Sequence, residues 1–201
     1  MDRSPQVALP RIGILALQGA VDLHVHALAR LGVETVEVRR AEHLARVDGL
    51  VLPGGESSTI SKLLVINELF EPLAERLDAG MPAFGTCAGM IMLASEILDG
   101  RDDQLSFSAI DISVRRNAFG RQIDSFETNL NVIGLAEAPV HAVFIRAPVV
   151  ERVGPGVEIL AAVEEGRPVA CRQDAVLVTS FHPELSPDLR LHELFIKGMA
   201  A

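Results

Sequence analysis

Residues 81–98 read MPAFGTCAGMIMLASEIL, and this segment predicts a strand, a sharp turn and a helix in direct succession. The apolar run MPAFG (81–85) is typical of a buried strand, and AGMIMLASEIL (88–98) is typical of a helix packed tightly against it. Between them, Gly85 and Gly89 flank Cys87, each two residues away from it. A turn built of such small residues can hold a nucleophilic side chain at the end of a strand.

Strand and helix patterns alternate through the part of the chain that precedes this segment. Apolar runs that end in glycine or polar residues predict strands, and apolar residues at helical spacing predict helices. The expected strands are RIGILALQG (11–19), VETVEVRR (33–40) and DGLVLPGG (48–55), and the expected helices are 20–31 and a long one from Ser57 to about Asp78. This alternation predicts a three-layer α/β fold with a mostly parallel, doubly wound sheet and right-handed crossovers.

The chain after residue 98 follows a different pattern, with short strand-like segments separated by turns. These segments lie near 107–115, 126–132, 141–146, 157–163, 167–172 and 175–181. They predict an antiparallel extension of the sheet, and 185–199 should contain a closing helix. We expect residues 1–10 to form a loose tail and residues 11–201 to form a single domain.

Length and composition are those of an ordinary folded protein. The chain has 201 residues, of which 49% are apolar and 22% charged, and its net charge is −9. An acidic balance of this size argues against nucleic-acid binding, which needs a basic face. No run approaches the roughly 20 apolar residues that a membrane-spanning helix needs, and residues 1–10 lack the apolar core of a signal peptide. We therefore expect a cytoplasmic protein with reduced thiols.

The chain has two cysteines, and the pattern around them distinguishes their roles. Cys87 would stand at the N-terminus of a helix, whose dipole favours the thiolate, and the N–H of Ala88 could face an oxyanion. The alternative for Cys87 is a buried structural cysteine at a tight turn, but the two glycines and the strand–helix context favour a nucleophile. Cys171 lies in a strand-like segment without glycines, and we interpret it as structural. The two do not have a metal-binding spacing.

A base for this nucleophile is expected at His182-Pro183-Glu184, after the apolar strand AVLVTSF (175–181). In an extended backbone, residues two apart project to the same side, so Glu184 could orient the imidazole of His182. On its own the tripeptide would suit a surface turn, and the nucleophile turn is what favours catalysis. The remaining histidines are expected to be solvated or structural; they are His24, His26, His43, His141 and His192.

The glycine-rich segment Pro53-Gly54-Gly55-Glu56-Ser57-Ser58 follows the third expected strand. Loops in this place supply oxyanion-binding N–H groups in enzymes with such a nucleophile turn. A simple tight turn is the alternative, and a phosphate-binding loop is disfavoured because the lysine of that motif is missing.

Taken together, these motifs resemble the glutaminase subunits of pyridoxal 5′-phosphate synthase, a family within the class I glutamine amidotransferases. The resemblance runs from about Arg11 to the end of the chain. It is carried by LALQGAVDLHVHAL (15–28), LPGGESST (52–59), FGTCAGMIMLA (84–94), RNAFGRQIDSFE (116–127), VFIRAP (143–148) and SFHPEL (180–185). The implied fold is flavodoxin-like. Ile91 occupies a place where many other class I members have glutamine, whereas Arg115 departs from the acidic residue expected there.

The resemblance implies an activity, a site and a partner. The activity is hydrolysis of L-glutamine to L-glutamate and ammonia, with Cys87 as nucleophile and His182 and Glu184 as its relay. Gly55 and Ala88 would bind the oxyanion, and the glutamine contacts would be Gly55, Glu56, Ser57, Arg116, Ile145 and Arg146. Neither a cofactor nor a metal is implied. The ammonia would pass to a synthase subunit with an (α/β)8-barrel fold in a hetero-oligomer, and Gln18 and Gly19 would respond to its docking.

Three other functions are compatible with these residues. The first is a glutaminase subunit that serves a different ammonia acceptor. The second is a peptidase-like cysteine hydrolase, which would not need the FIRAP or RNAFGRQ segments. The third is a regulatory subunit without activity, which the intact Cys, His and Glu set disfavours.

Overall fold

The computed structural model describes residues 9–116, 125–135, 138–163 and 166–199. Most of the expected N-terminal tail, residues 1–8, and most of the RNAFGRQIDSFE segment, residues 117–124, lie outside these ranges. The division of the chain into a tail and one domain therefore stays a prediction.

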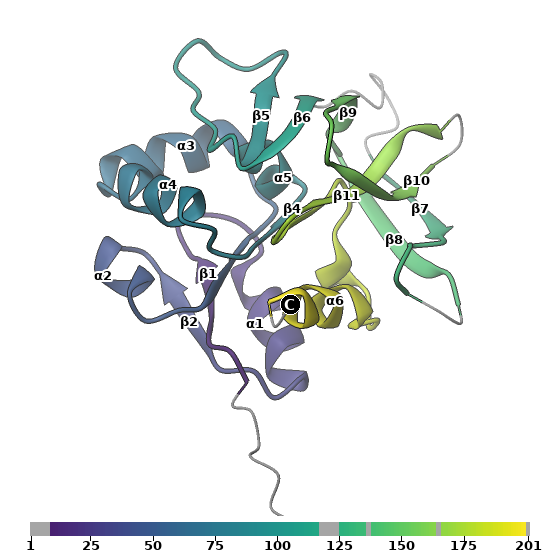
Figure 1. Cartoon of the computed structure of the whole chain (residues 1–201), viewed down its shortest axis with the longest axis horizontal. Coiled ribbons are helices and arrows are strands. Elements are labelled where there is room, and N and C mark those ends of the chain that lie inside the picture. The colour runs from purple at the N-terminus through teal and green to yellow at the C-terminus, as the bar shows by residue number, and fades with distance from the viewer. Residues whose placement is uncertain (1–8, 117–124, 136–137, 164–165, 200–201) are drawn as a thin grey trace, which may run out of the picture.

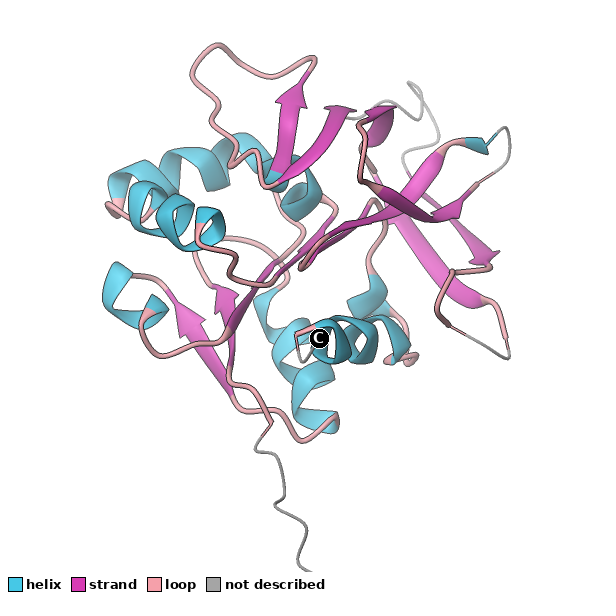
Figure 2. Ribbon diagram, viewed as in Figure 1, coloured by secondary structure: helices cyan, strands magenta, loops and turns pink. Residues whose placement is uncertain are grey.

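A seven-stranded sheet forms the middle layer of the fold (Figures 1 and 2). Its strand order is β10-β11-β12-β4-β3-β1-β2. The parallel strands are β1 (Ile12–Leu15), β2 (Thr35–Val38), β3 (Gly49–Leu52), β4 (Ala83–Thr86) and β12 (Val176–Thr179), and the antiparallel extension is β11 (Pro168–Gln173) and β10 (Glu158–Ala162). The expected mostly parallel sheet with an antiparallel extension is confirmed.

Helices cover both faces of this sheet. One face carries α2 (Ala41–Leu44), α3 (Ser57–Ile66), α4 (Phe70–Asp78) and α5 (Ala88–Leu93), and the other carries α1 (Val21–Arg30) and α6 (Arg190–Gly198). Alternate strand residues supply the two cores. In β3, for example, Leu50 and Leu52 pack with the first group of helices, whereas Val51 packs toward α1 and α6. The central strands β1, β3, β4 and β12 are buried on both sides, which explains their continuous apolar runs.

Two smaller sheets lie beside the main one. β5 (Ala94–Ile97), β6 (Ile110–Arg115) and β9 (Val149–Val153) form a three-stranded sheet, and β7 (Ser125–Leu130) pairs with β8 (Val140–Ile145). The short 3₁₀ helix η2 (Pro183–Leu185) leads from β12 toward α6. The sequence did not predict β9 as a strand.

Two expected helices were wrong in extent. The helix from Ser57 to about Asp78 is divided into α3 and α4, because Glu68 adopts a φ of 53° and ends the first helix. The turn brings Leu69 into the core, where it is fully buried. The helix expected over 88–98 ends at Leu93, and the following residues form β5, which pairs with β6.

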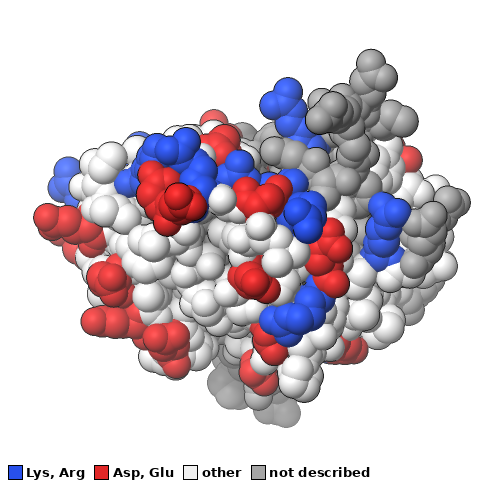
Figure 3. Space-filling view, turned by 90° about the horizontal axis from the view of Figure 1, so that it is seen from above, with Lys and Arg blue, Asp and Glu red and all other residues white. Residues whose placement is uncertain are grey.

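Charged side chains of both signs are interleaved on the face shown in Figure 3. Two cross-strand ion pairs join β6 to β9. Arg152 lies 2.5 Å from Asp111, and Arg115, the residue that departs from the expected pattern, lies 3.0 Å from Glu151. Among the described residues, no helix is long and apolar enough to cross a membrane.

Candidate active site

The candidate residues gather at the carboxyl ends of four neighbouring strands. Cys87 follows β4, the glycine loop follows β3, Gln18 lies after β1, and His182 lies after β12. All four strands are parallel, so their carboxyl ends meet at one edge of the sheet, where ligands bind in open α/β folds. The fold therefore brings together segments that are far apart in the chain.

Cys87 stands on a strained turn between β4 and α5. Its φ of 51° and ψ of −104° are rarely adopted by a residue with a side chain, and such a conformation costs about 1–3 kcal/mol. The flanking glycines are required by packing. A Cβ on Gly89 would lie 2.0 Å from the carbonyl oxygen of Leu52, and one on Gly85 would lie 2.6 Å from the backbone of Gly89. The strain is sustained by tight backbone contacts on both sides of the cysteine.

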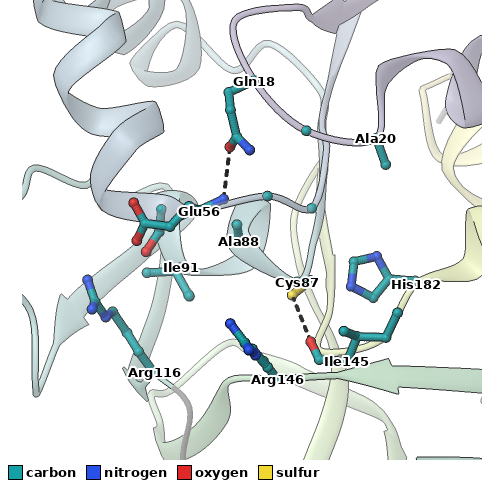
Figure 4. Close-up of a pocket in the computed structure, with 14 residues that line it drawn as sticks. Gln18, Ala20, Glu56, Cys87, Ala88, Ile91, Arg116, Ile145, Arg146 and His182 are labelled. Atoms are coloured by element: carbon teal, nitrogen blue, oxygen red, sulfur yellow. Dashed lines mark hydrogen bonds between the residues drawn. The ribbon is translucent and has the colours of Figure 1, made fainter. Parts of the chain in front are cut away.

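His182 lies beside Cys87 (Figure 4) and is held from behind by Glu184. Its Nδ1 is 2.7 Å from Oε1 of Glu184, a carboxylate whose side chain is completely buried. The expected extended backbone was wrong here, because η2 places Glu184 one tight turn after His182. The short 3₁₀ helix nevertheless brings the two side chains together.

The electrostatics of His182 favour a charged imidazole. Burial lowers the pKa of His182, but hydrogen bonds with Cys87 and Glu184 and the charge of Glu184 outweigh it and raise this pKa well above its usual value. Since Nδ1 is bonded to Glu184, the nitrogen that serves Cys87 is Nε2. A charged imidazole beside a cysteine is the arrangement that activates a cysteine nucleophile.

These residues border a cavity of about 440 Å³. Its walls include every candidate residue except Glu184, which lies behind His182. The lining residues are Gln18, Gly19, Ala20, Gly54, Gly55, Glu56, Ser57, Cys87, Ala88, Ile91, Arg116, Ile145, Arg146 and His182. A volume of this size suits a small polar molecule such as an amino acid.

Glu56 caps helix α3 with its carboxylate. The side chain accepts hydrogen bonds from the backbone N–H groups and the hydroxyls of Ser58 and Thr59, at 2.7–3.2 Å. Burial raises the pKa of Glu56, but these hydrogen bonds outweigh it and lower the value to about 2. The carboxylate of Glu56 is therefore fully occupied by hydrogen bonds at the start of α3. The backbone N–H of Glu56 donates to Oε1 of Gln18 at 2.8 Å.

The turn after β1 and the glycine loop are joined by the backbone as well. The N–H of Ala20 donates to the carbonyl of Gly54 at 3.1 Å, and a Cβ on Gly19 would lie 2.0 Å from that oxygen. Gly19 also has a φ of 114°, which favours glycine. Residues 17–19 therefore support the glycine-rich loop that follows β3.

The two candidate arginines enter the cavity from the side opposite Gln18 (Figure 4). Arg116 donates to Oε1 of Gln104 at 2.6 Å, and Gln104 in turn donates to Oγ of Ser57 at 3.0 Å. Arg146 has a φ of 46° and forms no hydrogen bond or ion pair with any residue in the described ranges. Its guanidinium is available to a ligand in the cavity.

The other cysteine differs sharply from Cys87. Cys171 is completely buried in β11, and burial raises the pKa of its thiol to about 12. It will remain a neutral thiol at physiological pH and cannot act as a nucleophile.

Sequence reasoning missed the role of two histidines. His24 on α1 and His192 on α6 are fully buried, and their rings meet at 3.0 Å between Nδ1 and Nε2. A signal was present, because His24 shares the buried face of α1 with Ala27 and Leu28. A histidine on the apolar side of a helix must find a partner inside the protein.

Because these two histidines are buried, we expect the free energy of unfolding to fall between pH 6.5 and 5. Burial lowers the pKa of both His24 and His192, the latter to about 3, so they stay neutral in the folded chain. In the unfolded chain each gains a proton below its usual pKa of about 6.5, which costs about 1.4 kcal/mol of stability per pH unit for each histidine. Urea unfolding at the two pH values measures this fall.

His182 does not contribute to that fall. Its pKa is raised, so its stabilisation is fully present below pH 6.5 and is lost only as the pH rises toward its folded value. His192→Phe is expected to reduce the dependence, because it removes one of the two buried groups that stay neutral in the folded chain. A stability that stays constant from pH 6.5 to 5 would contradict the neutral state of the buried pair.

The chain has relatives of known family along nearly its whole length. Residues 14–201 match the SNO glutamine amidotransferase family. Proteins named pyridoxal 5′-phosphate synthase subunit PdxT are 60% identical in Frankia alni, over 93% of this chain and 94% of theirs, and 60% identical in Nocardia farcinica, over 96% and 88%.

Solved structures agree with this assignment. A crystal structure of a glutamine amidotransferase superposes with a TM-score of 0.88 at 47% identity, and covers 94% of this chain and 99% of its own. A putative GMP synthase component from Thermoplasma acidophilum, at 18% identity and a TM-score of 0.67, shares the fold. On this evidence the chain belongs to the SNO glutamine amidotransferase family.

Proposed function

We propose that this chain is the glutaminase subunit of a pyridoxal 5′-phosphate synthase and that Cys87, His182 and Glu184 are its catalytic triad. The observation that carries the proposal is the position of His182, which lies beside Cys87 in the cavity (Figure 4) while its Nδ1 is 2.7 Å from Oε1 of the buried Glu184. The strained conformation of Cys87 supports it, because strain of this kind is concentrated at functional sites.

The reaction begins when His182 holds the proton of Cys87 and the thiolate attacks the side-chain carboxamide carbon of L-glutamine. The resulting oxyanion is stabilised by backbone N–H groups. Ala88 is the first residue of α5, so its N–H has no partner within the helix, and Gly55 borders the same cavity. His182 then protonates the departing ammonia, which leaves a glutamyl thioester on Cys87.

Water completes the cycle. His182 removes a proton from water, the hydroxide attacks the thioester carbonyl, and L-glutamate leaves as the thiolate of Cys87 re-forms. Glu184 stays ionised throughout and stabilises the imidazolium. Each turnover consumes one glutamine and one water and releases one glutamate and one ammonia.

The ends of glutamine are bound by the rim of the cavity. Arg116 and Arg146 are suited to the α-carboxylate through the fork geometry of guanidinium groups. Ile145 presents its carbonyl oxygen 3.8 Å from Sγ of Cys87, where it can accept from an N–H group of the substrate. Glu56 acts by fixing the loop that carries Gly55 and Ser57, since its carboxylate is already occupied.

The partner is a synthase subunit that accepts the ammonia, and we propose that it is an (α/β)8 barrel. This part rests on the names of the relatives, which are subunits of pyridoxal 5′-phosphate synthase. Gln18 is placed to report docking, because it holds the backbone of Glu56 at 2.8 Å and thereby touches the loop beside the nucleophile. A different ammonia acceptor is the second candidate for the partner.

The test measures glutamate release from L-glutamine by this chain alone and mixed with the synthase subunit of a pyridoxal 5′-phosphate synthase. We expect a large rise on mixing. Activity that is high alone and unaffected by that subunit would point to a different acceptor. The absence of glutamate release both from the chain alone and from the mixture would overturn the glutaminase assignment.

Arg146→Ala is expected to raise KM for glutamine by about 10–100-fold with a smaller change in kcat, since a hydrogen bond to a charged group contributes roughly 1.5–3 kcal/mol. Steady-state kinetics of glutamate release measure both constants. Arg172→Ala is the matched control, because Arg172 is paired with Glu158 at 2.6 Å in β10 and β11 and does not line the cavity. An unchanged KM in Arg146→Ala would exclude this arginine as a substrate contact.

A further inference from the structure

His24 projects from the buried face of α1 toward the rear of the proposed triad. Its side chain is fully buried, and its Nε2 lies 3.5 Å from Oε2 of Glu184 and 3.2 Å from Oγ1 of Thr86. On its other side, Nδ1 lies 3.0 Å from Nε2 of His192, and the ring of Phe84 closes the pocket edge-on. His24 thus links α1 to Glu184, which does not line the cavity.

The carboxylate of Glu184 needs a second partner. Its side chain has no exposed surface, and Oε1 is taken by His182. Oε2 makes no hydrogen bond within the described part of the chain, and the one titratable group recorded near it besides His182 is His24. A buried carboxylate oxygen without a nearby donor is costly, so the proton on His24 decides how well Glu184 is held.

The hydrogen-bond partners select one tautomer for each histidine. If His24 carries its proton on Nε2, that proton faces Glu184 and Thr86, and Nδ1 accepts from Nε2–H of His192. Within the described part of this cluster, Nδ1 of His192 then buries a lone pair, while Oε2 of Glu184, which has no hydrogen bond, has the protonated Nε2 of His24 3.5 Å away. In the opposite arrangement, His192 would bury an N–H without an acceptor, and His24 would point a lone pair at the carboxylate. An orphaned buried donor and two facing acceptors are both unfavourable.

We propose that His24 is a positioning residue whose Nε2–H faces Oε2 of Glu184 and keeps Oε1 directed at Nδ1 of His182. The proton chain runs from α6 through His192 and His24 to the carboxylate. This inference rests on the proposed function, in which Glu184 orients His182. It assigns a role to a polar side chain of α1 that is completely enclosed.

Two variants of nearly equal size separate positioning from packing. In His24→Gln the amide nitrogen reaches the place of Nε2, so an N–H group still faces Oε2 of Glu184. In His24→Asn the shorter amide reaches only the place of Nδ1, toward His192. We expect His24→Gln to retain kcat within about threefold and His24→Asn to lower kcat on the order of 10–100-fold, the usual effect of removing a residue that orients a site ligand. KM for glutamine should stay unchanged in both, since His24 does not border the cavity.

The control is His26→Gln, the same substitution on the same helix at an exposed side chain that bonds to the carbonyl of Asp22 at 2.6 Å. Glutamate release is measured with the synthase subunit present, and circular dichroism checks the fold of each variant. Equal kcat values for His24→Gln and His24→Asn, or a change that falls on KM, would overturn the proposal.

The wild-type chain supplies a measurement that requires neither a variant nor activity. Nitrogen NMR of ¹⁵N-histidine-labelled protein distinguishes a protonated ring nitrogen from an unprotonated one. We expect His24 to carry its proton on Nε2 at pH 7.5, and a proton on Nδ1 with Nε2 bare would overturn the inference. This outcome is independent of glutaminase activity, so a failure of the proposed function and a failure of the His24 assignment are told apart.

Discussion

Cys87→Ser is expected to lower glutamate release on the order of 10⁴–10⁶-fold, the range seen when the nucleophile of a triad is removed. A serine hydroxyl occupies nearly the same space, so the cavity should keep its shape. The hydroxyl does not ionise at neutral pH, however, and the charged His182 beside it can no longer be matched by a thiolate. The fall should appear in kcat and kcat/KM together.

Cys171→Ser provides the matched control for this result. That thiol is buried in β11 and has a pKa of about 12, so its replacement should leave kcat unchanged even if it lowers stability slightly. Retention of more than a tenth of the wild-type kcat in Cys87→Ser would show that another group attacks the carboxamide.

Gly54→Ala is expected to lower kcat by about 100-fold although it adds a single methyl group. The new Cβ would lie 2.4 Å from Cε1 and 2.9 Å from Nδ1 of His182, closer than any real contact. The imidazole must shift away, and a displacement of about 1 Å of a catalytic group costs about 10²-fold in rate. Steady-state kinetics combined with thermal unfolding distinguish this local effect from loss of the fold.

Gly198→Ala is the control for the same chemical change. Gly198 is the last residue of α6 and does not line the cavity. A Cβ added there would meet no atom of the described residues within 4 Å. Its replacement should leave activity intact and raise stability slightly, because alanine favours a helix more than glycine does. A normal kcat in Gly54→Ala would contradict the expectation that the added methyl group displaces a catalytic His182.

Local patterns in the sequence were sufficient for the nucleophile turn and for the positions of the parallel strands along the chain. The two glycines around Cys87 are a short-range signal, and each buried strand is a continuous apolar run bounded by turn residues. Because ligands in open α/β sheets bind at the carboxyl ends of the strands, the glycine loop and His182 were expected near Cys87. The choice of Arg116, Ile145 and Arg146 as glutamine contacts came from family resemblance alone.

Features that depend on distant contacts could not be predicted in this way. The short apolar run after Cys87 fits a helix or a strand, and pairing with β6 is what makes Ala94–Ile97 the strand β5. The division between α3 and α4 depends on one left-handed residue, Glu68, which has no special sequence signal. The use of Glu56 as a helix cap and the contact of His24 with Glu184 appear only when the chain is folded.

Gly19 and Gly89 allow main-chain segments to touch at the site with no side chain between them. A Cβ at either Gly19 or Gly89 would lie 2.0 Å from a carbonyl oxygen of a neighbouring loop or strand. Distances within this part of the protein are therefore fixed by peptide groups, whose dimensions no substitution can alter. Mutagenesis that aims at a new substrate should leave these backbone contacts intact. It should instead vary the part of the cavity that is lined by the side chains of Ile91, Arg116 and Arg146.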